Sequence, residues 1–146
     1  MDGSGQFVDR SAGVGFDSLG NHFALASADF NADGFLDVIL TGPGTTPLLH
    51  MNSCGDNAWL AIELIGPPGN QEGFGARAEV TGSGGTQIRE LYNLRGMGQG
   101  PSRFQFGLGS DDEAERVRIE WPDGAVSEAE RVPTRRFMRV THPSLL

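Results

Sequence analysis

Apolar and polar residues alternate along most of the chain from residue 59 onward. The clearest run contains Val117, Ile119 and Trp121, which alternate with arginine and glutamate. A period of two places successive side chains on opposite faces of a strand, one face buried and the other solvated. Comparable alternation occurs at 60–64, 76–80 and 104–108, and further apolar stretches occur at 86–92, 125–132 and 136–141. These patterns predict seven strands within about ninety residues.

Glycine and proline turns separate these runs at 66–69, 82–85, 107–109 and 122–124. We find no amphipathic helix of useful length, so an antiparallel β-sandwich or barrel is expected for this part of the chain. The first fifty residues have shorter patterns that predict strands at 6–9, 22–28, 36–40 and 47–51. The fold class is therefore predicted to be all-β throughout.

An acidic segment at 29–37 joins two of the short strands. It reads Asp-Phe-Asn-Ala-Asp-Gly-Phe-Leu-Asp, with oxygen-bearing side chains at its first, third, fifth and ninth positions and a glycine at its sixth. Calcium takes about 6–8 oxygen ligands and tolerates irregular geometry. The glycine permits a sharp reversal of the chain. The segment is predicted to be a calcium-binding hairpin loop with the following ligands: the side chains of Asp29, Asn31, Asp33 and Asp37, and the carbonyl of Phe35.

The segment has two other possible interpretations. An EF-hand or dockerin-type loop needs an acidic residue at position twelve and a following helix, whereas position twelve is Leu40 and a β-branched run follows the loop. That interpretation fails. An acidic turn that satisfies itself through Asx turns stays open as the alternative to calcium.

Composition limits the class of protein. At 146 residues the chain suits one ordinary domain or a small module. Its formal charge of −8 argues against nucleic acid as a partner, and no apolar stretch is long enough for a membrane span. A single cysteine, Cys54, excludes an internal disulfide framework. The first residues have neither the basic region nor the apolar core of a signal peptide, so we expect a mature or truncated form or a different route.

The first part of the chain resembles one FG-GAP (VCBS-type) repeat. The resemblance lies in the glycine-rich segment 3–9 and in 24–40, where Ala28 and Asn31 replace a frequent glycine and aspartate. Such repeats form blades of calcium-decorated β-propellers, so the resemblance implies a blade-like calcium hairpin for residues 1–53. Only one repeat is found, whereas a propeller needs about four to eight blades.

The second part resembles the ASPIC/UnbV domain. The matching residues are Trp59-Leu60 and the segments 73–77, 106–109 and 117–124, and the loop 96–102 departs from the pattern. Together the two resemblances indicate a cartilage-acidic-protein-like family. They imply an extracellular or periplasmic location, with a repeat at 1–53, a linker at 54–57 and a β-sandwich domain at 58–146.

No catalytic constellation is evident in the sequence. The three histidines, His22, His50 and His142, are far apart, and no serine lies in a nucleophile-elbow context. Trp59 and Trp121 lie in alternating strands and are expected to be core residues rather than carbohydrate platforms. Segment 111–113 is interpreted as a solubilising acidic loop, with a second cation site as the alternative. The arginines of the last third alternate with glutamates, so cross-strand ion pairing explains them more simply than an anion site.

The predicted function is that of a calcium-stabilised binding, adhesion or assembly module without catalytic activity. One alternative is a carbohydrate-binding accessory domain, and another is a structural subunit of a larger multi-chain assembly. A protein or glycan partner and self-association are therefore expected classes of interaction. Residues 1–53 carry little apolar surface, so we expect them to pack on the 58–146 sandwich or on another chain.

Overall fold

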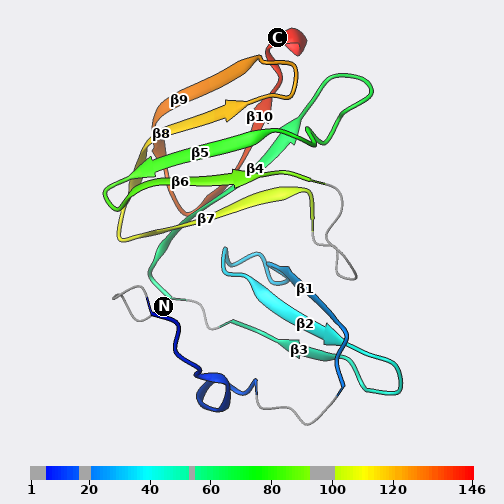
Figure 1. The fold of residues 1–146 in the computed structure, drawn as a ribbon. Helices are drawn as coiled ribbons and strands as arrows, with labels where there is room; N and C mark the ends of the chain where they lie inside the picture. The colour runs from blue at the N-terminus through cyan, green and yellow to red at the C-terminus, as the bar shows by residue number, and fades with distance from the viewer. Residues whose placement is uncertain (1–5, 17–20, 53–54, 93–100) are drawn as a thin grey trace.

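A computed structural model describes residues 6–16, 21–52, 55–92 and 101–146. Ten strands form three sheets, and none of these closes into a barrel within the described residues (Figure 1). The remaining regular structure described is two short 3₁₀ turns, η1 (Ser11–Val14) and η2 (Pro143–Leu145). No helix of the described residues is long and apolar enough to cross a membrane. The all-β prediction is confirmed.

The N-terminal sheet consists of β1 (Ala24–Ala28), β2 (Asp37–Thr41) and β3 (Leu48–His50), all antiparallel and in that order. The strands predicted at 22–28, 36–40 and 47–51 are thus confirmed. The strand predicted at 6–9 is wrong, because this segment has no sheet partner. Instead, the Asp9 carboxylate accepts hydrogen bonds from the backbone N–H and the hydroxyl of Ser11, and these bonds begin the turn η1.

The seven strands predicted after residue 58 are all present. They are β4 (Ala58–Ile65), β5 (Arg77–Gly82), β6 (Gly85–Glu90), β7 (Arg103–Gly109), β8 (Glu113–Glu120), β9 (Val126–Pro133) and β10 (Arg136–Thr141). One sheet has the order β10-β4-β7 and the other has the order β6-β5-β8-β9. Figure 1 shows these green-to-red strands as two layers, with the blue-to-cyan N-terminal sheet outside them.

One pairing departs from the predicted antiparallel architecture. Strand β10 runs parallel to β4, with Arg136 opposite Leu60 and Thr141 opposite Ile65. The chain leaves β9 through Arg135, whose φ is +53° and whose N–H donates to the carbonyl of Trp59. This bond directs β10 to the edge of β4 that β7 does not occupy. Alternation predicts that a segment is a strand, but it carries no information about the direction of the neighbouring strand.

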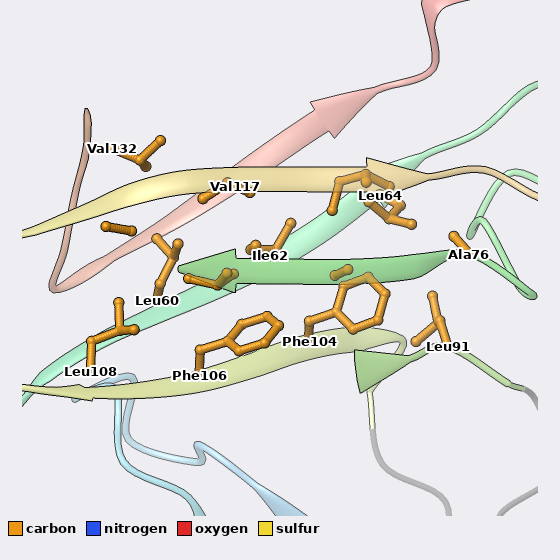
Figure 2. Close-up of a cluster of buried hydrophobic side chains, with 14 of the residues drawn as sticks. Leu60, Ile62, Leu64, Ala76, Leu91, Phe104, Phe106, Leu108, Val117 and Val132 are labelled. Carbon is orange, nitrogen blue, oxygen red and sulfur yellow. The ribbon is translucent and has the colours of Figure 1, made fainter. Parts of the chain in front are cut away.

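The hydrophobic core lies between the two layers of the sandwich. Figure 2 shows Leu60, Ile62 and Leu64 of β4 close to Phe104 and Phe106 of β7. All five are buried, and the core also includes the apolar positions of β5 and β8. The inward faces are therefore the ones that the alternating pattern predicted. The opposite face of the β10-β4-β7 sheet, called here the outer face, carries Trp59, Ala61, Glu63, Arg103, Gln105, Phe137 and Arg139.

The N-terminal sheet buries very little of its own surface. Among the described residues of 6–52, Gly34 and Asp37 are the buried ones. Phe23 is 63% exposed and Leu25 is 54% exposed, and Leu49 on β3 is 50% exposed. The sheet reaches the sandwich through the turn between β1 and β2 and not through these apolar side chains.

Candidate functional site

The turn between β1 and β2 contains the residues that the sequence predicted as calcium ligands. Asp29 follows the last residue of β1, and Asp37 is the first residue of β2. The chain reverses with positive φ at Ala32 (60°) and Gly34 (92°). Both oxygens of Asp29 accept backbone hydrogen bonds, from Asp33 N at 3.0 Å and from Gly34 N at 2.9 Å. One carboxylate therefore organises the centre of the turn.

Asp37 is fully buried and connects the turn to the rest of the sheet. Its Oδ2 accepts the N–H of Phe30 at 2.9 Å, and its Oδ1 accepts the N–H of Asn52 at 2.8 Å. A buried carboxylate is costly unless hydrogen bonds satisfy it. Asp37 meets that condition while joining the start of the turn to the segment that follows β3.

Asn31 and Asp33 complete the polar network of the turn. The Asn31 amide donates to Asp33 Oδ2 at 2.7 Å, and Asp33 Oδ1 accepts the N–H of Phe35 at 2.9 Å. Asn31 Oδ1 accepts the N–H of Asp33 at 3.2 Å. These are Asx-type turns, in which a side chain replaces a backbone acceptor.

The donor chemistry of this turn fits a hard cation such as calcium. All the predicted side-chain ligands offer oxygen, and a carboxylate oxygen that accepts one N–H bond retains a second lone pair. In the described residues, however, no three carboxylate, imidazole or thiol groups converge as a metal cluster. The structure thus brings Asp29, Asn31, Asp33 and Asp37 into one turn. Their side-chain oxygens accept hydrogen bonds mainly from backbone N–H groups.

The turn also docks on the outer face of the sandwich. Gln105 Nε2 donates to the carbonyl of Gly34 at 2.6 Å. A Cβ atom added to Gly34 would come within 1.8 Å of the indole of Trp59, which is 9% exposed. Only a glycine allows this close approach of the turn to the ring. From the sequence, Gly34 is expected to permit chain reversal. The structure shows that it also allows the contact with the sandwich.

Neither tryptophan offers an exposed ring. Trp59 packs edge-to-face against Phe137, with ring centroids 4.9 Å apart. Trp121 is 2% exposed, and its Nε1 donates to the hydroxyl of Ser127 at 3.0 Å. Both rings are buried, as expected, but Trp121 belongs to the core between the layers, whereas Trp59 is buried on the outer face beneath the docked turn.

The arginines of β5, β8 and β9 in the four-stranded sheet are paired with glutamates. Arg118 lies 3.0 Å from Glu120 and 3.9 Å from Glu79, and Glu79 also pairs with Arg77 at 3.0 Å. The hydrogen bond to Glu120 is the main cause that raises the pKa of Arg118. Arg118–Glu79 and Arg116–Glu128 are cross-strand pairs that the alternating charges predicted, whereas Arg77–Glu79 and Arg118–Glu120 each join residues of one strand.

Asp111 has a structural role that the sequence did not reveal. Its carboxylate accepts the hydroxyl of Ser83 at 2.6 Å and the N–H of Ser83 at 2.8 Å. These two hydrogen bonds, the hydroxyl first, lower the pKa of Asp111. They join the β5–β6 turn to the β7–β8 turn, which are 28 residues apart in the chain. The sequence did not predict this role, because no local pattern indicates a contact between residues 28 positions apart.

A serine, a histidine and an aspartate meet at the C-terminal end of the fold. His142 Nε2 lies 3.1 Å from Asp123 Oδ2, and His142 Nδ1 lies 2.8 Å from the hydroxyl of Ser144. The backbone N–H of Ser144 also donates to Nδ1, at 3.1 Å. The ring nitrogen is therefore the N-cap acceptor of η2, with its lone pair directed to that N–H. In this geometry the imidazole caps the first turn of η2.

The fold and the docked turn define a two-layer all-β domain with a small N-terminal sheet attached. A family model described as "ASPIC and UnbV" matches residues 66–145, which is more than half of the chain. The chain belongs to the ASPIC and UnbV family. A search of curated proteins found no match. The resemblance of residues 58–146 to this family is thus confirmed over the matched range.

Proposed function

We propose that the chain is a calcium-stabilised recognition or assembly module without catalytic activity, working in an extracellular or periplasmic setting. The observation that carries the proposal is the docked turn, in which four oxygen-bearing side chains lie in one loop whose glycine contacts Trp59. In this proposal residues 1–53 are a single FG-GAP-like repeat with a blade-like hairpin. Residues 58–146 are the sandwich on which the repeat docks.

Calcium would be held by Asp29, Asn31, Asp33 and Asp37 together with the carbonyl of Phe35. The positive charge of the cation would offset the mutual repulsion of three aspartates that lie within nine residues of the chain. The backbone N–H groups already oppose the repulsion among these carboxylates. The role of the metal is therefore to stabilise the turn and its contact with the sandwich.

Native mass spectrometry of the full chain, with calcium and with EDTA, tests this function. We expect one calcium ion per chain at millimolar calcium, because sites in extracellular modules have Kd values on the order of 10⁻⁴–10⁻³ M. Magnesium should bind poorly, since it demands near-octahedral geometry and loses water reluctantly. A mass that is identical in calcium and EDTA would contradict the calcium-stabilised module.

Assembly is the second candidate function, and the exposed N-terminal sheet favours it. Strands β1 and β3 are the edges of this sheet, and neither has a second strand partner in the described residues. Leu25 and Leu49 are half exposed on opposite faces of it. Unpaired edges and apolar faces of this kind invite pairing with another chain. Sedimentation velocity over a range of concentrations tests this candidate, which predicts a mass above that of one chain.

A further inference from the structure

A groove separates the turn 29–36 from the outer face of the β10-β4-β7 sheet. Its volume is about 560 Å³, and it is lined by Asp29 and Ala32 from the turn and by Glu63, Arg103 and Phe137 from the sheet. A second cavity of about 460 Å³ shares Asp29 and Arg103 with the first. Arg103 therefore lies where two cavities meet, between the docked turn and the sandwich.

The charged side chains of the groove differ in whether they have a partner. Arg139, Glu63 and Arg103 form one row across the three strands of the sheet. Glu63 is paired with Arg139, whose Nε lies 2.8 Å from its carboxylate. Asp29 accepts two backbone N–H groups of its own turn. Arg103 makes no ion pair with any carboxylate that the structure describes, although it is only partly exposed.

The guanidinium of Arg103 is held in place by an aromatic ring. It lies over Phe137, at 4.9 Å from the ring centroid, and Phe137 is in turn packed against Trp59. Stacking of this kind fixes the plane of the guanidinium and leaves its N–H donors to bind a ligand. A planar fork of donors matches a carboxylate, which it can bind through two parallel hydrogen bonds.

We propose that this groove binds a glycan containing a uronic acid, with Arg103 as the receptor of the sugar carboxylate. Glu63 and Asp29 are acceptors that sugar hydroxyl groups can satisfy, and Ala61 provides a small apolar floor beside them. An acidic peptide is disfavoured, because further carboxylates would meet Glu63, Asp29 and a chain with a net charge of −8. The proposal deepens the recognition function proposed above by naming its ligand class and the residue that selects it.

Isothermal titration calorimetry of the full chain with galacturonosyl-rhamnose, a disaccharide that carries a single carboxylate, tests the proposal. The matched ligand control is the methyl ester of the same disaccharide, which keeps the rings and the hydroxyl groups but removes the one carboxylate charge. We expect saturable binding of the acid and binding about tenfold weaker for the ester, because one charge-assisted hydrogen-bonded pair is lost. Equal binding of acid and ester, or no saturable binding of the acid, would overturn the proposal.

Variants of the protein assign the effect to Arg103. Arg103→Gln is expected to weaken binding of the acid about tenfold, and Arg103→Lys to weaken it less because the charge remains. Arg116→Gln removes the same charge from the other sheet and should bind like the parent. Binding by Arg103→Gln that equals the parent's would overturn the assignment. Tighter binding of a polyglutamate peptide than of the disaccharide would contradict a glycan ligand and favour a protein partner.

The same variants separate this proposal from the calcium-stabilised module. Each titration is run with EDTA and with calcium, since uronates themselves bind calcium. If Arg103→Gln loses sugar binding but keeps the calcium-dependent rise in Tm, both proposals stand. If calcium has no effect on Tm while the parent still binds the sugar through Arg103, the metal proposal fails and the glycan site remains. If calcium stabilises the chain and the sugar does not bind, the glycan proposal alone fails.

Discussion

Single side chains in the turn 29–37 each perform more than one task. Asp29 and Asp37 together accept four backbone N–H groups, and Asp37 does so while fully buried. Gly34 permits the reversal and also allows the indole of Trp59 to approach the backbone. Substitutions at these positions should therefore separate metal binding, turn geometry and docking.

Replacing Asp33 by alanine is expected to abolish the stabilisation by calcium. At calcium about tenfold above Kd, ligand binding contributes about 1.4 kcal/mol, which raises Tm by roughly 3–5 °C in a chain of this size. The measurement is the difference in Tm between calcium and EDTA for each variant. Asp111→Ala is the control, because Asp111 holds Ser83 and not the turn, and its calcium increment should equal that of the parent. A full increment in Asp33→Ala would exclude Asp33 as a ligand.

Replacing Gly34 by alanine should destabilise the docked turn. The new Cβ would collide with Trp59, and φ at this position is +92°, so we expect a loss of about 2–4 kcal/mol in the free energy of unfolding. Gly44→Ala is the matched control, since Gly44 also has positive φ (72°) but has nothing within 4 Å of the added Cβ. Urea unfolding followed by tryptophan emission measures both. An equal loss in the two variants would show that the Trp59 contact has no energetic role.

At the scale of elements, hydrogen bonds between turns hold the strands of the sandwich together. Asp111 joins the β5–β6 turn to the β7–β8 turn through Ser83, and the Thr134 hydroxyl ties the β9–β10 turn to the carbonyl of Asp112. The outer charges of β5 and β8 are paired within and across the strands but are solvated. Exposed ion pairs contribute little to stability, so the connections between turns are the better targets for mutation.

The contribution of Asp111 to stability should depend on pH. Its folded-state pKa lies below the ordinary carboxyl value, because the ionised form accepts two hydrogen bonds from Ser83. The stabilisation is therefore present above the unfolded pKa of about 3.9 and is lost as the pH falls through the lower folded value. Asp111→Ala should lower Tm at pH 7, and the difference from the parent should shrink as the pH falls below the ordinary carboxyl pKa. Glu115→Ala, on the exposed face of β8, should leave Tm unchanged, and a pH-independent effect of Asp111→Ala would contradict the linkage.

At the scale of the whole molecule, the two parts differ in how much surface they bury. The sandwich has a continuous core between two layers, whereas the N-terminal sheet leaves large apolar side chains such as Phe23 and Phe30 exposed. Docking through one turn covers Trp59 but leaves most of the small sheet in solvent. We therefore expect the sandwich to bury enough apolar surface to fold alone, and the small sheet to bury too little.

Separate expression of the two parts tests this difference. Residues 55–146 should keep a β-type circular dichroism spectrum, while residues 1–53 should stay unfolded even at millimolar calcium, because ordering their backbone costs more than their burial returns. The isolated sandwich should also show red-shifted tryptophan emission, since Trp59 loses its cover by Gly34. A folded spectrum for residues 1–53 alone would contradict this account of the molecule.

The sequence alone determined the class of fold, the inward faces of the sandwich and every strand of the sandwich. Alternation in β4, β7 and β8 is a local property of the chain, and local patterns decide which side chains face a core. The spacing of Asp29, Asn31, Asp33 and Asp37 likewise predicted that these residues would share one turn, although calcium binding itself stays a prediction.

Only the tertiary structure decided the contacts between distant segments. The parallel pairing of β10 with β4, the bond from Asp111 to Ser83 and the approach of Gly34 to Trp59 join residues that are far apart in the chain. Local sequence also fails to single out Arg103. The alternation around it predicts only a solvated position on an ordinary strand. Its place between two cavities arises from the docking of a turn some seventy residues earlier, which no local pattern encodes.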